Sequence, residues 1–361
     1  MPVTAAPLLS PASPIVQIQP LGFPWVTMDP FLFCAYHDDA YPAGSRDLGP
    51  NAPLAGRTMG QDFSRKDGWS MYHGTGVPGF PSHPHRGFET VTVVRKGLID
   101  HADSLGAAAR FGGGDVQWLT AGSGVVHSEM FPLLDAAAPN PLELFQIWLN
   151  LPASHKMVPP HFTMLWSEKI PRHVTTDVQG RSTEVAVIAG QLKGLEEAQS
   201  LEPLAPPTDS WAAQADADVA IWTLRVAPGA RWTLPAAEGA ETRRTLYFFK
   251  GASISAAGKP VAHHAAIELR ARAAVELVNT GGDVAEFLLL QGKPIAEPVA
   301  QYGPFVMNTQ AEIEQTLQDY RRTQFGGWPW PDEAPVHGRD PIRFARHPDG
   351  HEERPLAPRT E

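Results

Sequence analysis

The chain has little of what marks secreted or membrane-spanning proteins. Its 361 residues include a single cysteine, Cys34, so no internal disulfide can form, and a reducing compartment is favoured. Cys34 lies in an apolar run and is expected to be a small buried hydrophobe. Nowhere do 18 apolar residues run together, and the N-terminus has neither the cationic region nor the apolar core of a secretion signal. We therefore expect a cytoplasmic protein that does not enter a membrane.

Positive charge is also scarce, because 29 Lys and Arg residues face 39 Asp and Glu residues and the net charge is -10. A chain of this charge is repelled by nucleic acid and by anionic membrane surfaces. We expect neither as a partner, and we expect a monomer.

Glycine and proline are abundant, with 32 and 36 residues, and they separate apolar runs of strand length. This pattern is typical of all-β sandwiches or barrels. The segment FETVTVVRKG (88–97) can be laid on TRRTLYFFKG (242–251), which predicts two copies of one β-fold. The aromatic segment 30–44 is expected to pack on one of them.

From these patterns we expect four parts in the chain. They are an N-terminal extension (1–14), a first β domain (15–155), a second β domain (156–310), and a helix with an extended tail (311–361). The acidic, Pro-rich segment 196–218 is expected to be a surface loop. In the tail, Trp328 and Trp330 are expected to contact the body of the protein, and the charged end is not.

Two pairs of polar residues predict a metal site. His83 and His85 form one pair, and His127 and Glu129 form another about forty residues later. Residues i and i+2 of a strand point to the same side, so each pair converges on one point. Three imidazoles and one carboxylate suit Fe(II), Mn(II), Co(II), Ni(II), Cu(II) or Zn(II). On an octahedral metal, four such ligands leave two positions open.

Two other residues compete for a place in this site. Glu89 lies four residues after His85, and an uninterrupted strand would put both on the same face. The i+2 spacing to His127 favours Glu129 as the carboxylate ligand, with a second role as general base. His101 has no diagnostic spacing, and we interpret it as structural.

Longer motifs resemble the pirin family of two-domain cupins. They are HPHRGFETVT, the sequence HADS that begins at His101, GDVQWLTAGSGVVHSEM, and GPFVMNT followed by a helix. The resemblance runs from about residue 15 to about residue 322. It implies two cupin jelly-roll barrels face to face. It also implies an N-terminal metal site, usually iron, formed by the residues that match His83, His85, His127 and Glu129, and a C-terminal barrel without metal.

Three residues depart from the usual pattern of that family. Ser123 stands where a basic residue is common, Leu119 where Met is common, and Phe131 where Pro often follows the HSEM motif. All three are expected near the site, where they would change the shape and charge of the pocket.

The resemblance implies two alternative functions. Bacterial pirins are similar in activity to quercetin 2,3-dioxygenase, which opens the central ring of a flavonol with O2 and releases carbon monoxide. This favours an Fe(II)-dependent dioxygenase with a flavonol-like aromatic substrate, in which Glu129 accepts the substrate proton. Animal pirins are thought to act on transcription factors, so the alternative is a non-catalytic, redox-sensitive iron protein that regulates a protein partner. A purely structural metal is a third reading, disfavoured by the open coordination positions.

Overall fold

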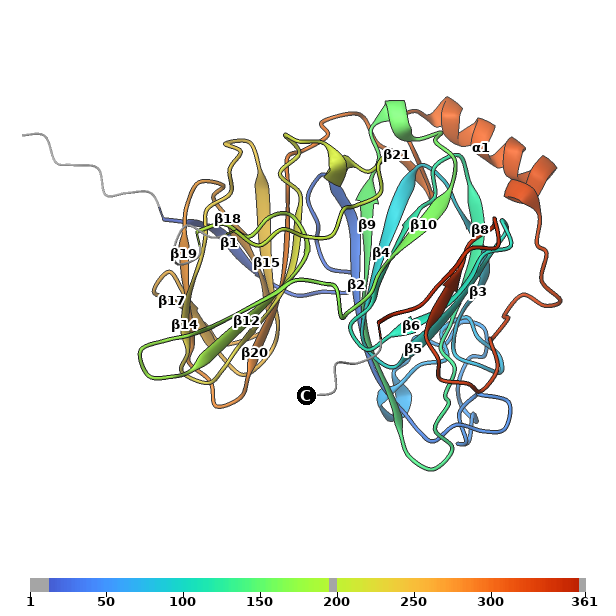
Figure 1. Cartoon of the computed structure of the whole chain (residues 1–361), viewed down its shortest axis with the longest axis horizontal. Coiled ribbons are helices and arrows are strands. Elements are labelled where there is room, and N and C mark those ends of the chain that lie inside the picture. Colours follow the sequence, from blue (N-terminus) through green and yellow to red (C-terminus); the bar gives the residue numbers. More distant parts are fainter. Residues whose placement is uncertain (1–12, 195–199, 357–361) are drawn as a thin grey trace, which may run out of the picture.

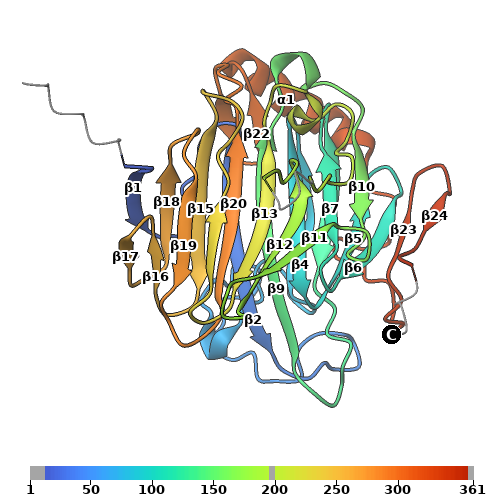
Figure 2. The ribbon, with the colours of Figure 1, turned by 60° about the vertical axis from the view of Figure 1, so that its left-hand side comes forward.

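Two β-barrels lie side by side in the computed structural model, which describes residues 13–194 and 200–356. Each barrel is built from two main antiparallel sheets. The strands of both barrels lie roughly along one common axis (Figure 2). This confirms the all-β fold expected from the spacing of glycine and proline. Within the described residues, no helix is long and apolar enough to cross a membrane.

The first barrel combines a five-stranded and a six-stranded sheet. The five-stranded sheet has the order β10 (His161–Leu165), β7 (Val116–Thr120), β4 (Phe88–Lys96), β9 (Asn140–Asn150), β2 (Phe31–Tyr41). The six-stranded sheet has the order β24 (Glu352–Glu353), β23 (Phe344–Arg346), β6 (Ala108–Gly112), β5 (Leu98–Asp103), β8 (Val125–Met130), β3 (Gly79–His85). The segment 30–44, expected to pack on a barrel, supplies a strand of it.

The second barrel combines a seven-stranded and a four-stranded sheet. The larger has the order β1 (Ile15–Pro20), β18 (Ala265–Leu269), β15 (Arg243–Lys250), β20 (Ala285–Gly292), β13 (Ala220–Val226), β12 (Ser182–Ala189), β11 (Arg172–Thr176). The smaller has the order β14 (Arg231–Leu234), β19 (Val275–Asn279), β16 (Ile254–Ala256), β17 (Lys259–Val261). A separate hairpin pairs β21 (Ala300–Tyr302) with β22 (Phe305–Met307).

The internal repeat is confirmed by strand pairing. In the first barrel β4 lies between β7 and β9, and in the second β15 lies between β18 and β20. The register of β4 shifts between Val94 and Lys96, and that of β15 shifts between Phe248 and Lys250. These positions coincide when FETVTVVRKG is laid on TRRTLYFFKG.

The expected division of the chain into parts stays a prediction, and most of the extension 1–14 lies outside the described residues. Two pairings bear on where a division can fall. Strand β1 pairs with β18 of the second barrel, and β10 pairs with β7 of the first. Each barrel therefore includes a strand from the other side of a simple cut near residue 155.

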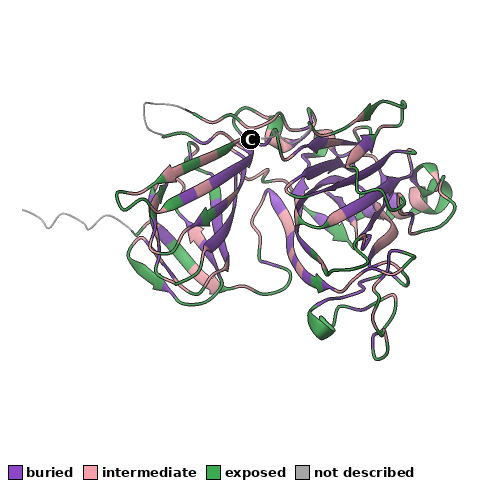
Figure 3. Ribbon diagram, turned by 60° about the horizontal axis from the view of Figure 1, so that its bottom comes forward, coloured by how far each residue is buried: buried purple, intermediate pink, exposed green. Residues whose placement is uncertain are grey.

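An apolar cluster joins the two barrels. The outer face of the five-stranded sheet packs on the outer face of the seven-stranded sheet, and central strands such as β4 and β20 are buried along most of their length (Figure 3). Phe145 of β9 is fully buried there, and its ring lies 5.0 Å from that of Phe249 and 5.7 Å from that of Trp25. Cys34 lies in the same cluster with no exposed surface, as expected for a small hydrophobe.

The expected helix is confirmed as α1 (Gln310–Thr323), on the side of the first barrel away from the second (Figure 1). A capping box begins it, because the Thr309 side chain accepts from the Glu312 N–H and the Glu312 carboxylate accepts from the Thr309 N–H. Ile313 packs into a small cluster with Val126 of β8. The helix therefore covers the outer side of the strand that carries His127.

The tail is more ordered than expected. The Trp330 indole N–H donates to the Asp103 carbonyl at 2.8 Å, which agrees with the expected contact. The charged end, expected to stay free, instead supplies β23, which pairs with Ala108–Arg110 of β6. The expectation failed because three-residue strands such as β23 are too short to show a period.

The segment 196–218 also departs from a plain surface loop, although residues 195–199 lie outside the described residues. Ser210 is fully buried, and its hydroxyl donates to the Glu89 carboxylate at 2.5 Å. Ala217 belongs to the cluster between the barrels. Part of this segment therefore fills the interface.

We expect Phe145→Ala to lower the free energy of unfolding by about 3–5 kcal/mol, because it leaves a cavity in a fully packed interface. Val178→Ala is the control, since Val178 is 95% exposed and its truncation should change stability by less than about 0.5 kcal/mol. Denaturant titration of both variants measures the difference. Equal midpoints would show that the cluster between the barrels contributes little to stability.

Candidate metal centre and pocket

Three predicted histidines meet inside the first barrel. Strand β3 pairs with β8 so that His83 lies directly opposite His127, and His85 follows on the same face. The three rings lie 4.5 to 4.9 Å apart, centroid to centroid. One nitrogen from each ring lies within 4.8 Å of the other two, a separation that could hold a single metal ion.

The nitrogens of these rings are suited to metal binding because several of them lack a hydrogen-bond partner in the described part of the chain. The Nδ1–H of His83 donates to the Pro81 carbonyl at 2.8 Å, which leaves Nε2 with a free lone pair. Nδ1 of His85 and both nitrogens of His127 are buried without a partner among the described residues. Burial lowers the pKa of His83 to about 4 and those of His85 and His127 well below their usual value. Neutral, unpaired imidazoles are the form that binds metal.

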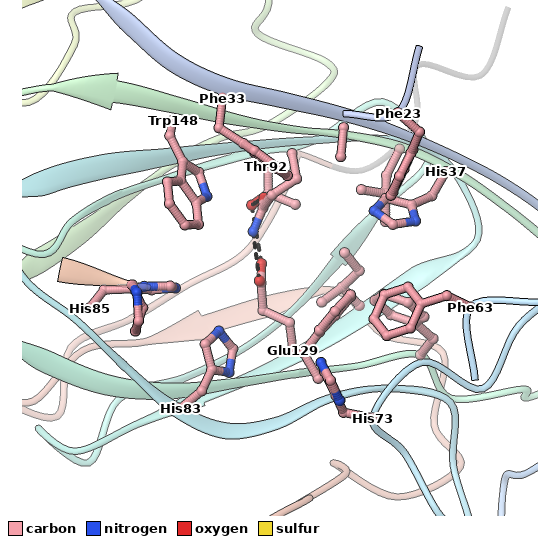
Figure 4. A pocket seen from close by; sticks show the side chains of 17 residues that line it. Phe23, Phe33, His37, Phe63, His73, His83, His85, Thr92, Glu129 and Trp148 are labelled. Atoms are coloured by element: carbon pink, nitrogen blue, oxygen red, sulfur yellow. Dashed lines mark hydrogen bonds between the residues drawn. The ribbon is translucent and has the colours of Figure 1, made fainter. Parts of the chain in front are cut away.

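Glu129 lies beside the histidines with its carboxylate turned toward β4 and β9 (Figure 4). Its Oε2 is 4.0 Å from Nε2 of His127 and accepts from the Gln146 amide at 2.8 Å. Burial raises the pKa of Glu129 above its usual value. The structure thus brings three of the four predicted ligands together. The ligand role of Glu129 stays a prediction.

A ring of hydrogen bonds explains how Glu129 can hold a proton. Oγ1 of Thr92 is 3.1 Å from Oε1 of Glu129 and 2.5 Å from Oε1 of Gln146, but a hydroxyl has one proton to donate. All three contacts are satisfied when Glu129 donates a proton to Thr92, Thr92 donates to Gln146, and Gln146 donates back to Glu129. The carboxyl group is therefore placed to exchange a proton with a neighbour.

Neither competing residue joins the three histidines. The strand ends at His85, and β4 begins at Phe88, so Glu89 does not continue the face of His85. Glu89 points to the interface between the barrels, where it accepts from Ser210 and, at 2.8 Å, from Thr120. His101 is next to His127, and its Nε2 lies 3.2 Å from the Asp103 carboxylate. This is consistent with a structural histidine.

A pocket of about 350 Å³ opens from the histidines between the two sheets of the first barrel. Alternate residues of β2 and β9 form one wall, among them Phe33, His37 and Trp148. Phe63 and His73 come from residues 42–78, which connect β2 to β3 and contain no strand or helix longer than three residues. Sequence reasoning missed this connection, because it has no periodic pattern. Its only signal was a group of aromatic and histidine residues in a polar segment.

The three departures from the family pattern have different places. Phe131 lines the pocket, as expected. Leu119 is buried in the core behind the site, and Ser123 offers its backbone carbonyl to the Arg86 guanidinium at 2.7 Å. Among the described residues that line the pocket, neither Leu119 nor Ser123 is present. Of the three, only Phe131 directly shapes the pocket wall.

Comparison with known protein families places both halves of the chain. Residues 19–149 match the pirin family, and residues 221–326 match the pirin C-terminal cupin domain. The chain belongs to the pirin family. The two barrels are therefore cupins, as the sequence motifs implied.

Similar proteins are known from bacteria and animals. A Pseudomonas aeruginosa protein named "putative quercetin 2,3-dioxygenase" is 37% identical over 68% of this chain and 79% of its own length. Human pirin is 35% identical over 69% of this chain and 78% of its own length. The crystal structure of a quercetin 2,3-dioxygenase from Acinetobacter baumannii has a TM-score of 0.63 and 27% identity, covering 82% of this chain and 86% of that one.

We expect His127→Ala to weaken metal binding by about 100-fold or more, because losing even a residue that only orients a ligand costs about 10- to 100-fold. His73→Ala is the control, since His73 lines the same pocket but lies outside the group of three histidines. Anaerobic titration with Fe(II) and with Ni(II) measures both affinities. Equal affinity in the two variants would rule out His127 as a ligand.

Proposed function

We propose that this pirin is a metal-dependent dioxygenase that opens a flavonol-type aromatic substrate with O2, with Fe(II) as its metal. The observation that carries the proposal is that a group of histidines and an aromatic pocket adjoin each other. Three neutral imidazoles with unpaired nitrogens lie at one end of a pocket whose other walls are largely aromatic. The similarity to the Pseudomonas and Acinetobacter proteins supports the same class of reaction.

The pocket suits a flat, mostly apolar molecule. Its volume of about 350 Å³ falls within the ~300–1,000 Å³ of small-molecule sites, and its polar groups are few. Phe33 and Trp148, whose rings lie 4.9 Å apart, form an aromatic wall next to the histidines (Figure 4). Such a wall favours stacking with an aromatic ring and keeps water away from the reacting centre.

The residues around the metal position have three separate roles: binding the metal, accepting the substrate proton and holding the proton acceptor in place. His83, His85, His127 and Glu129 would hold the metal, which would supply a Lewis acid and a site for O2. Glu129 accepts the proton of the substrate hydroxyl, because it is buried beside the histidines and linked to two groups that can rearrange their hydrogen bonds. Thr92 and Gln146 hold the carboxyl group in place, and all three of their contacts are satisfied once Glu129 has accepted the proton.

We expect Glu129→Gln to lower kcat for quercetin by about 100-fold or more, the usual contribution of a general base. Glu89→Gln is the matched control, because Glu89 is an equally buried carboxyl group in the same barrel that faces the interface instead. Oxygen uptake and loss of flavonol absorbance are measured for Fe(II)-, Mn(II)- and Ni(II)-loaded protein, with metal content determined for each sample.

The two variants separate the possible results. Loss of uptake in metal-containing Glu129→Gln, with activity kept in Glu89→Gln, supports the proposal. Full activity of Glu129→Gln contradicts the base role. Tight metal binding in the wild-type protein without oxygen uptake for any loaded form contradicts the dioxygenase itself.

A further inference from the structure

A second polar group lies in the pocket away from the candidate metal centre. His37 lines the pocket from β2, and Figure 4 shows it on the opposite side of Glu129 from His83 and His85. Phe23 and Phe80 bound the space near His37, with ring centroids 6.0 and 6.1 Å from its own, and Phe63 lies on the same side of Glu129 (Figure 4). This end of the pocket is formed partly by residues 42–78, and nothing in the reaction described above uses it.

His37 belongs to a buried chain of three side chains. Its Nδ1 lies 2.8 Å from the Tyr72 hydroxyl, and that hydroxyl donates to Oδ2 of Asp39 at 2.7 Å. The other carboxylate oxygen of Asp39 accepts from the Ser70 N–H at 3.0 Å. His37, Tyr72 and Asp39 are 6%, 4% and 1% exposed, so each contact is shielded from bulk water.

The chain fixes which nitrogen of His37 carries a proton. Tyr72 has one hydroxyl proton and gives it to Asp39, so its oxygen accepts from Nδ1–H of His37. Burial lowers the pKa of His37 to about 4, which keeps the ring neutral near pH 7. Nε2 is then an acceptor. Among the described residues it has no hydrogen-bond partner, and it is not one of the fully enclosed polar atoms.

The backbone of Tyr72 indicates that this placement is imposed. Its φ is +57°, in the left-handed region that residues with a side chain rarely adopt. Two backbone hydrogen bonds of 2.8 Å to Asp62 hold it there, and Asp62 is itself paired with Arg57 at 2.8 Å. Strained positions of this kind collect at ligand sites, where the surrounding structure holds them.

We propose that Nε2 of His37, oriented by Tyr72 and Asp39, accepts a hydrogen bond from a hydroxyl group on the substrate ring farthest from the metal. The inference rests on the proposed function and narrows its substrate class to flavonols with a hydroxyl group on an outer ring. A flavonol of this kind is held at both ends, with its metal-side hydroxyl near Glu129 and its distal hydroxyl at His37.

The test compares quercetin, which has outer-ring hydroxyl groups, with 3-hydroxyflavone, which has none. Binding to the anaerobic, metal-loaded protein is measured by quenching of tryptophan fluorescence, because Trp148 lines the pocket. We expect His37→Phe and Tyr72→Phe to weaken quercetin binding roughly three- to tenfold, the effect of losing one hydrogen bond, and to leave 3-hydroxyflavone binding unchanged. Binding of 3-hydroxyflavone also shows that each variant retains a folded pocket.

Tyr41→Phe is the matched control. The Tyr41 hydroxyl is also buried in this region and donates to the Ser70 carbonyl at 2.7 Å, but Tyr41 does not line the pocket. It should bind both flavonols as the wild-type protein does. Equal losses for both ligands in Tyr72→Phe, or no loss for quercetin, would overturn the inference.

Failure of the inference can be told from failure of the proposed function. If the wild-type protein oxidises both flavonols and binds them equally, the dioxygenase reaction is supported and only the role of His37 is contradicted. If the wild-type protein binds neither flavonol, both the proposed function and the role of His37 are contradicted.

Discussion

The pairing of β3 with β8 is the constraint on which the candidate site depends. It sets His83 opposite His127 and leaves His85 and Glu129 on the same inward face. A slip of one residue would turn a whole strand over and point its ligands to the outside. The register is secured from both sides, because β5 pairs with the other edge of β8 and places Asp103 opposite His127. Helix α1 then packs over the outer side of β8 through Val126.

This arrangement buries several polar side chains inside an apolar barrel, which is unfavourable unless each finds a partner. Thr92 and Gln146 satisfy Glu129, and the backbone satisfies Nδ1 of His83. One nitrogen of each of His83, His85 and His127 is left for a metal. The large apolar cluster between the barrels stabilises the first barrel from outside, so its inner face can carry chemistry. Strand β4 of the five-stranded sheet has one face for each role, because Thr92 faces the pocket and Glu89 faces the interface.

The all-β class, the internal repeat and the three histidines could be predicted from local patterns, and the cupin barrels from the resemblance of longer motifs to the pirin family. The i+2 spacing within His83–His85 and His127–Glu129 depends only on strand geometry, and the helix expected from residue 311 follows from the helical spacing of its apolar residues. The pocket beyond the metal could not be predicted. Tyr72 reaches it from an irregular connection, where no period relates one residue to the next. Glu89 faces the interface and not the histidines because the chain turns after His85, and residue spacing alone does not reveal that turn.

Crystals of the Fe(II)-loaded protein, grown without oxygen in the presence of quercetin, would test the central claim most directly. Anomalous scattering at the iron edge locates the metal without assumptions about its ligands. We predict one iron peak within coordination distance of a nitrogen of each of His83, His85 and His127, with the flavonol in the adjoining pocket. Iron bound elsewhere, or a loaded site whose pocket excludes the flavonol, would contradict the account.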